Sequence, residues 1–175
     1  MQTEIISKSN AKINLGLKII DKRANGFHNI ESIFIEIDFY DIISFSPSNK
    51  FSLICNERSI PINEKNTIYK IYHQLEKRYS FKKQYQINLT KNIPIGSGLG
   101  GGSSNAACVL NTLNKVENLN LSQIELLNLA QSVGSDVPFF LDGKVQFVQG
   151  RGEILNKISY SALKKIFIIL VIPSF

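Results

Sequence analysis

Five glycines fall within the seven residues from Gly96 to Gly102, and a helical pattern over Ser103–Val116 follows them at once. Fixing so many glycines in a helix or strand costs backbone entropy, so the segment predicts a loop. Glycine permits positive φ angles and lets backbone N–H groups approach a ligand closely. Because the loop leads into a helix N-terminus, where Ser103 or Ser104 would lie near the cap, it predicts an anion site. The alternative is a flexible turn without a ligand.

Several known phosphate loops do not fit this segment. The pattern G-x-G-x-x-G occurs at Gly96, Gly98 and Gly101, but a dinucleotide fold needs a strand soon after the helix. Here Ser122-Gln123-Ile124-Glu125 predicts a capping box that opens a second helix. A P-loop needs a lysine directly after the glycines, and none follows Gly102. The H-R-D and D-F-G elements of protein kinases are also missing from the sequence. The loop is therefore a phosphate cradle of another design.

Hydrophobic periodicity predicts an α+β fold, with strands early and helices later. Residues 11–20 alternate strictly, with apolar side chains on one face and Lys12 and Asn14 on the other, which predicts a half-buried strand. Pro47-Ser48-Asn49 predicts a hairpin loop between two short strands. The other predicted strands span residues 30–39, 41–45, 51–55, 85–89, 145–148 and 165–172. Two further helices are predicted, one over 67–79, which Asn66 or Thr67 would cap, and one from Ser122 to Val133.

Composition sets the class of protein. The chain has 175 residues, of which 43% are hydrophobic and 19% charged, and these values exclude an intrinsically disordered chain. The net charge of +6 suits an anionic ligand such as a phosphate, and it also suits nucleic acid. Cys55 and Cys108 lack metal-binding spacing. Because no signal peptide opens the sequence and the apolar run 166–172 is too short for a bilayer, we expect a cytoplasmic protein with reduced thiols.

Two further segments complete a pattern with the glycine loop. Ala11–Leu15 puts a lysine and an asparagine on one strand face, and Gly134–Phe140 places Asp136 between a helix end and a proline. Together with Pro94–Ala107, these segments resemble the GHMP kinase superfamily, which uses an N-terminal lysine segment, a glycine-rich phosphate loop and a carboxylate in the substrate site. The resemblance implies the N-terminal domain of that superfamily. Its fold is similar to domain 2 of ribosomal protein S5, with a mixed or antiparallel sheet and helices on one side.

The resemblance implies an ATP-dependent kinase that uses Mg²⁺. Ser103 or Ser104 would then ligate Mg²⁺, and Asp136 would accept the proton of the attacking hydroxyl. Lys12 would keep that carboxylate ionised and stabilise developing negative charge. Without a kinase role, Asp136 would be a turn residue that caps the next segment, and Lys12 an ordinary exposed lysine. The expected ATP-binding residues are Pro94, Ile95, Gly96, Ser97, Gly98, Leu99, Gly100, Gly101, Gly102, Ser103 and Ser104.

The triple-glycine loop and Gly26-Phe27-His28 narrow the resemblance to superfamily members that phosphorylate a cytidine diphosphate-linked methylerythritol in non-mevalonate isoprenoid synthesis. That substrate implies a hydrogen bond from His28 to the cytosine edge, packing of Phe27 on the base, and hydrogen bonds from Asn14 to erythritol hydroxyls. Phe27 stands where the family more often has tyrosine, and Asn25 where it more often has aspartate. The expected partner is this small molecule, with no nucleic acid and no membrane.

Superfamily members continue into a second lobe, which carries a further glycine-rich turn and lends an aromatic residue to the cytidine pocket. Nothing in this sequence corresponds to it, so we expect residues 1–175 to be the ATP-binding domain without its C-terminal lobe. Weak or absent catalysis and an exposed apolar face would follow. Three alternatives stay open: a GHMP kinase acting on another alcohol, such as mevalonate or homoserine; an RNA-binding module; and a non-catalytic remnant that binds ATP.

Overall fold

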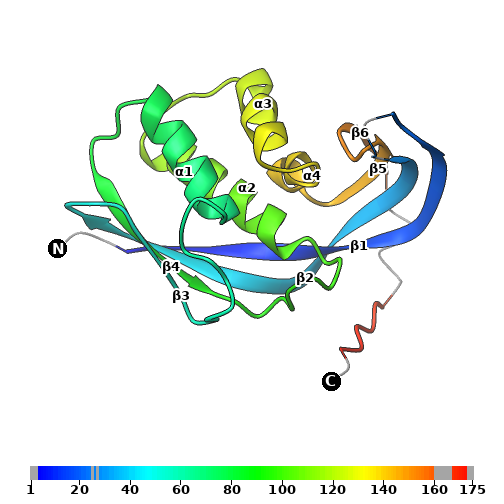
Figure 1. The fold of residues 1–175 in the computed structure, drawn as a ribbon, viewed down its shortest axis with the longest axis horizontal. Helices are drawn as coiled ribbons and strands as arrows, with labels where there is room; N and C mark the ends of the chain where they lie inside the picture. Colours follow the sequence, from blue (N-terminus) through cyan, green and yellow to red (C-terminus); the bar gives the residue numbers. More distant parts are fainter. Residues whose placement is uncertain (1–3, 25, 27, 160–166, 173–175) are drawn as a thin grey trace.

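The computed structural model describes residues 4–24, 26, 28–159 and 167–172. In this part of the chain the helices lie on one face of a six-stranded sheet (Figure 1), which confirms the predicted α+β class. The strands are β1 (Ile5–Lys22), β2 (His28–Ser48), β3 (Ser52–Cys55), β4 (Gln84–Thr90), β5 (Val145–Gly150) and β6 (Ile154–Lys157). The helices are α1 (Thr67–Arg78), α2 (Gly101–Val116), α3 (Gln123–Val133) and α4 (Val137–Asp142).

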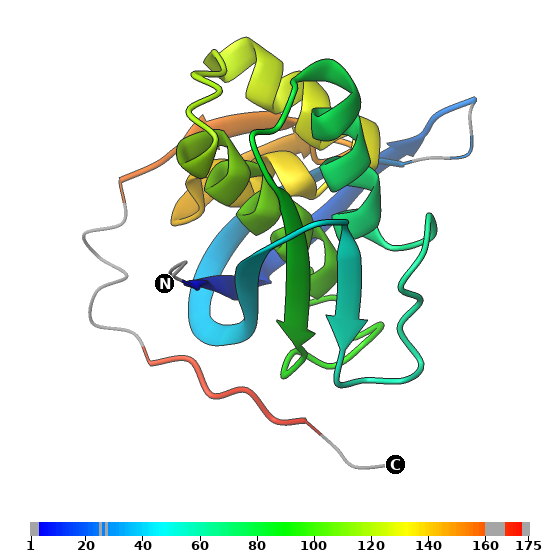
Figure 2. The same ribbon diagram turned by 90° about the vertical axis from the view of Figure 1, so that its left-hand side faces the viewer.

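β2 is the central strand of the sheet. It pairs antiparallel with β1 along one edge. Along its other edge it pairs with β5 through residues 30–35 and with β4 through residues 42–48, again antiparallel. β3 lies outside β4 and runs parallel to it, as the two arrows in Figure 2 show. The sheet is therefore mixed, as the resemblance implied.

The hairpin predicted at Pro47-Ser48-Asn49 is wrong. The first two of these residues still pair with Tyr85 and Gln84 of β4, so β2 extends into the expected turn and ends at Ser48. β3 pairs with the far side of β4 and not with β2, and α1 lies in the crossover that a parallel pair requires. The strands expected over 30–39 and 41–45 are likewise one long strand.

The main core lies between the helices and the sheet, and it fixes the axis of α2. α1 and α2 turn their aliphatic stripes toward β2 and β4. Asn66 caps α1, because its side chain accepts a hydrogen bond from the Ile68 amide at 2.8 Å. The buried side chains of this core include Ile43, Phe45, Ile68, Ile71, Tyr72, Leu75, Ile87, Leu110 and Leu113.

The capping box predicted for α3 is present, and the first residue of α2 differs from the predicted one. Ser122 and Glu125 form the predicted capping box at the start of α3. α2 begins at Gly101, two residues earlier than predicted, and its N-cap is Gly100, which has a left-handed conformation with φ +74°. Ser103 and Ser104 consequently lie inside the first turn of the helix and not at its cap.

The far half of β1 departs from the predicted half-buried strand. Residues Leu15–Lys22 are all exposed, Leu17 at 56% and Ile19 at 60%, whereas Lys12 is only 5% exposed. The register with β2 shifts after Asn14, and this half of the strand extends past the helices (Figure 1). The apolar face that the alternation predicted to be buried is therefore left uncovered by the helices.

The strand expected over 165–172 is not formed where the structure describes it. Residues 167–172 have no regular secondary structure, and Phe167 is 95% exposed; residues 165 and 166 lie outside the described residues. An apolar run makes a stable strand only where neighbouring strands and a second layer cover it. In the described ranges, no helix has the length and hydrophobicity needed to cross a membrane.

Replacement of Gly100 by alanine is expected to lower the free energy of unfolding by about 2–4 kcal/mol. Its φ is +74°, and an added Cβ would lie 2.7 Å from Cζ of Phe140 and 3.2 Å from Cγ of Lys12. Gly96→Ala is the matched control: φ is +71°, but no atom lies within 4 Å of the added Cβ, so a loss of about 1 kcal/mol is expected. Urea denaturation measures both, and equal losses would contradict close packing of the loop against Phe140.

Candidate active site

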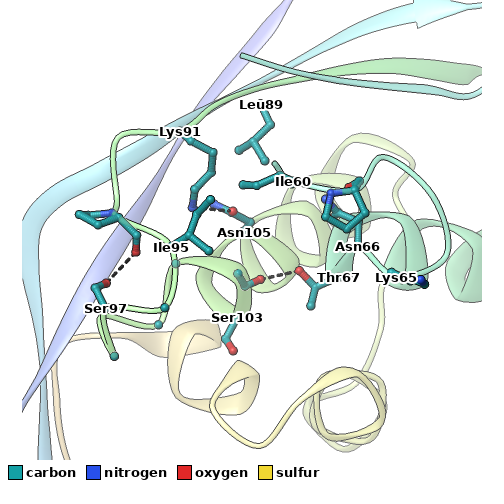
Figure 3. Close-up of a pocket in the computed structure, with 17 residues that line it drawn as sticks. Ile60, Lys65, Asn66, Thr67, Leu89, Lys91, Ile95, Ser97, Ser103 and Asn105 are labelled. Carbon is teal, nitrogen blue, oxygen red and sulfur yellow. Dashed lines mark hydrogen bonds between the residues drawn. The ribbon is translucent and has the colours of Figure 1, made fainter. Parts of the chain in front are cut away.

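The glycine loop connects β4 to α2 and forms one wall of a pocket (Figure 3). Gly96, Gly98 and Gly100 all have positive φ, at +71°, +76° and +74°. The Ser97 hydroxyl donates to the Pro94 carbonyl at 2.7 Å and tightens the turn. Because only glycine adopts these angles without strain, the alternating glycines fix the path of the loop.

The pocket has the chemistry of an anion site. The N-terminus of α2 opens into it, and Lys65, Thr67 and Lys91 line its other walls. The Thr67 hydroxyl donates to the Gly102 carbonyl at 2.7 Å and holds the first turn of the helix. The unsatisfied N–H groups and the positive end of the helix dipole favour a phosphate here. The expected ATP-binding residues that line the pocket are Pro94, Ile95, Gly96, Ser97, Gly98, Gly100, Gly101, Gly102 and Ser103.

Two of the expected loop residues face elsewhere. Leu99 is 8% exposed and packs in a small cluster with Ala11 and Ile93. Ser104 is 3% exposed, and its hydroxyl forms a 2.7 Å hydrogen bond with the Ser9 hydroxyl. Of the two serines considered as Mg²⁺ ligands, Ser103 lines the pocket and Ser104 is turned into the interior.

Lys12 is a buried cation next to the loop. Its Nζ lies 3.7 Å from Oδ2 of Asp136 and donates to Oδ1 of Asn14 at 2.6 Å. The ammonium also lies 4.5 Å from the centroid of the Phe34 ring, a cation–π distance. Burial lowers the pKa of Lys12 from its ordinary value, and the Asp136 carboxylate opposes that shift. The alternative prediction for Lys12, an ordinary exposed lysine on a strand, is therefore wrong.

Asp136 occupies the N-cap position of α4 without acting as a cap. Its side chain makes no capping hydrogen bond and instead extends to Lys12. The carboxylate remains 31% exposed, so a substrate can reach it. Gly152, with φ +117°, lies beside it, and a Cβ there would be 3.5 Å from Oδ1 of Asp136. A capping role would have tied this carboxylate to backbone N–H groups, and the structure leaves it available for chemistry.

One backbone hydrogen bond joins the loop to this pair. The Lys12 amide donates to the Leu99 carbonyl at 2.9 Å. The anion site and the Lys12–Asp136 pair therefore sit side by side. This arrangement combines binding of a phosphate with a carboxylate that can accept a proton, which is what phosphoryl transfer to a hydroxyl requires.

Asn14 is held in place by a residue that the sequence did not single out. Its Nδ2 donates to the Ser32 hydroxyl at 3.2 Å, and Ser32 in turn donates to the Gly16 carbonyl at 2.6 Å. Ser32 is 4% exposed. A lone serine within a strand carries no motif, and only the pairing of β1 with β2 brings it to Asn14.

Of the two residues expected to bind a nucleobase, the structure describes His28, and no described contact joins it to this cluster. Phe27 lies outside the described residues. His28 is exposed at the first position of β2, where it pairs in register with Lys22. The described contacts bring together Lys12, Asn14, Asp136 and the loop, and leave His28 at the far end of the strand.

Comparison with known proteins agrees with this geometry. Residues 66–144, which include the loop, α2 and Asp136, match the family model described as the GHMP kinases N terminal domain. This segment of the chain is a GHMP kinase N-terminal domain.

The curated relatives narrow the family further. The chain is 43% identical over 153 residues to 4-diphosphocytidyl-2-C-methyl-D-erythritol kinase of Chlorobium limicola, covering 87% of this chain and 53% of the relative. It is 39% identical over 176 residues to the protein of the same name from Syntrophomonas wolfei, covering 100% of this chain and 61% of the relative. The chain thus spans between about half and three-fifths of the length of these relatives.

Solved structures give the same picture. A crystal structure of 4-(cytidine 5'-diphospho)-2C-methyl-D-erythritol kinase superposes with a TM-score of 0.74 at 33% identity, covering 89% of this chain and 55% of that one. Homoserine kinase from Cytophaga hutchinsonii superposes with a TM-score of 0.61 at 20% identity, covering 89% of this chain and 51% of that one, which is evidence of a shared fold.

Asp136→Asn is expected to lower the pKa of Lys12 further, because the carboxylate that opposes the effect of burial is removed. NMR titration of the Lys12 side chain measures this pKa. Asp142→Asn is the matched control, since that carboxylate lies in α4 but contacts Lys157 at 3.0 Å on the surface. An unchanged pKa of Lys12 in Asp136→Asn would contradict the coupling of the two groups.

Proposed function

We propose that this chain is the ATP-binding domain of a 4-diphosphocytidyl-2-C-methyl-D-erythritol kinase, which transfers a phosphoryl group from ATP to the 2-hydroxyl of its substrate. The observation that carries the proposal is the buried Lys12–Asp136 pair, held beside the glycine loop by the Lys12–Leu99 hydrogen bond. Identities of 39–43% to relatives of that name support the choice of substrate.

The loop contributes positioning. Gly98 and Gly100 to Ser103 line the pocket at the N-terminus of α2, and backbone amides at such a position hold phosphates without reorganisation. The Ser103 hydroxyl is the proposed protein ligand for Mg²⁺, which usually takes one or two protein ligands together with phosphate oxygens. Bound Mg²⁺–ATP supplies the phosphoryl group and charge neutralisation.

Asp136 is the proposed general base. Its half-exposed carboxylate accepts the proton of the substrate hydroxyl, and the Lys12 ammonium lies 3.7 Å from it. The buried ammonium also stabilises negative charge that develops next to it, because few waters screen it there. Asn14 orients Lys12 through their 2.6 Å hydrogen bond, while its Nδ2 donates to the Ser32 hydroxyl at 3.2 Å.

The cytidine end of the substrate is assigned to Phe27 and His28, with Asn14 serving the erythritol hydroxyls. We also propose that a second lobe completes the site. The exposed apolar side chains of β1, including Leu15 and Leu17, are a surface suited to covering by such a lobe. The isolated chain is therefore expected to turn over slowly.

Asp136→Asn is expected to lower the rate of phosphoryl transfer by about 10²–10⁴-fold, the usual contribution of a general base, while the Kd of Mg²⁺–ATP changes little. Product formation with the cytidylated substrate, measured under single-turnover conditions by phosphorus NMR, gives the rate. Asp142→Asn controls for loss of a carboxylate from the same helix. Unchanged turnover in Asp136→Asn would refute the assignment of the base.

The choice of alcohol is tested by competition. The cytidylated methylerythritol, mevalonate and homoserine are supplied together with ATP, and phosphorylation of the cytidylated alcohol is expected to dominate. Preferential phosphorylation of mevalonate or homoserine would move the chain to another branch of the GHMP kinase family and would leave the roles of Lys12 and Asp136 intact.

A further inference from the structure

Asp41 is a fully buried carboxylate beneath the glycine loop, and the proposed mechanism does not use it. It lies in β2 and is 0% exposed. Its Oδ1 accepts hydrogen bonds from the amides of Asn92 at 2.7 Å and Ile93 at 2.9 Å. Its Oδ2 accepts from Nδ2 of Asn105 at 2.8 Å and from the Lys91 ammonium. Both oxygens are thus saturated by donors from outside its own strand.

These donors come from the two ends of the loop. Residues 91–93 form the segment in which the chain leaves β4 and enters the loop, and Asn105 lies in α2 just after the loop. Asp41 therefore joins the entry and the exit of the loop to one rigid strand. Four hydrogen bonds to one ionised carboxylate are an unusually strong connection, because charge-assisted bonds exceed neutral ones in strength.

Between these ends, the loop has few contacts of its own. Its internal bonds are the one from Ser97 to the Pro94 carbonyl and a 3.4 Å bond from the Leu99 amide to the Ser97 hydroxyl. The bond from Lys12 to Leu99 holds the loop near its exit. The direction of the loop amides consequently depends on where the two ends are fixed.

The network also places Lys91 close under the helix N-terminus. Figure 3 shows its side chain reaching toward Asn105, whose Oδ1 lies 3.4 Å from Nζ. A Cβ added to Gly101 would lie 2.8 Å from the same Nζ. Asp41 balances this buried charge, so the ammonium stays in place under the first turn of α2.

We propose that Asp41 is a positioning residue for nucleotide binding: it holds the two ends of the glycine loop at the separation at which the loop amides converge on a phosphate. The inference rests on the proposed function, because it takes the pocket ligand to be a nucleotide phosphate. It adds a residue that touches neither nucleotide nor substrate and acts through the backbone of residues 92 and 93 and through Asn105.

The test is Asp41→Asn, which keeps the shape of the side chain but removes its charge and turns one acceptor into a donor facing Asn105 and Lys91. The Kd values of Mg²⁺–ATP and of adenosine are measured by NMR titration on the full chain. ATP binding is expected to weaken about tenfold or more, and adenosine binding to stay within about twofold. Asp38→Asn is the matched control, an exposed aspartate of the same strand, and should change neither Kd.

A purely structural role gives a different result. If Asp41 only stabilised the fold, ATP and adenosine would weaken equally or not at all, and either outcome would overturn the inference. Failure of the unmodified chain to bind ATP would instead overturn the proposed function and the inference together. If the unmodified chain and Asp41→Asn both bound ATP normally, the inference about Asp41 would be wrong and the proposed function would stand.

Ser9→Ala covers the case in which Asp41→Asn does not fold. The Ser9 hydroxyl accepts from Nδ2 of Asn105 at 3.0 Å and lies outside the pocket lining. Its loss loosens the exit of the loop without touching the nucleotide. A weakening of about two- to fivefold for ATP, with adenosine unchanged, is expected, because the substitution removes two neutral hydrogen bonds, one to Asn105 and one to the Ser104 hydroxyl. An unchanged Kd of ATP in the folded Ser9→Ala protein would overturn the inference.

Discussion

The 2.9 Å hydrogen bond from the Lys12 amide to the Leu99 carbonyl ties the glycine loop to the strand that carries the buried ammonium. The loop amides and the Lys12–Asp136 pair therefore keep a fixed relation, which phosphoryl transfer needs more than any covalent chemistry from the protein. Burial of Lys12 is unfavourable, as its lowered pKa shows, and Asp136, Asn14 and the Phe34 ring partly offset that cost.

One side of the glycine loop lines the pocket, and the other side is bonded to the interior of the protein. Its outer side offers amides and the start of α2 to the pocket, while its inner side is fastened to buried polar groups. Asp41 fastens residues 92 and 93, and the Ser9–Ser104 hydrogen bond fastens the first turn of α2. A glycine-rich segment has little side-chain packing to hold it, so these inner contacts supply the rigidity that preorganised amides require.

The sequence predicted the parts of the site that depend on local chemistry. The glycine loop and the capping box at Ser122 could be predicted from local motifs, and the conjunction of Lys12 with Asp136 was implied by the resemblance to GHMP kinases. The parts that depend on strand register could not: Asp41 and Ser32 matter only because of what β4, α2 and β1 bring next to them. The same limit explains the wrong hairpin, since a proline-containing turn signal does not reveal that β4 lies between β2 and β3. Period-two alternation likewise predicted one buried face for β1, although its far half extends past the helices.

The central claim is that the glycine loop and the N-terminus of α2 bind the phosphates of a nucleotide. Backbone amide shifts of the full chain, followed by NMR as Mg²⁺–ATP is added, test it most directly. The account predicts the largest changes at the amides of Gly98 to Ser103, with smaller ones at Lys12 and Thr67. Changes confined to surface lysines such as Lys82 and Lys83, or no saturable changes at all, would contradict it.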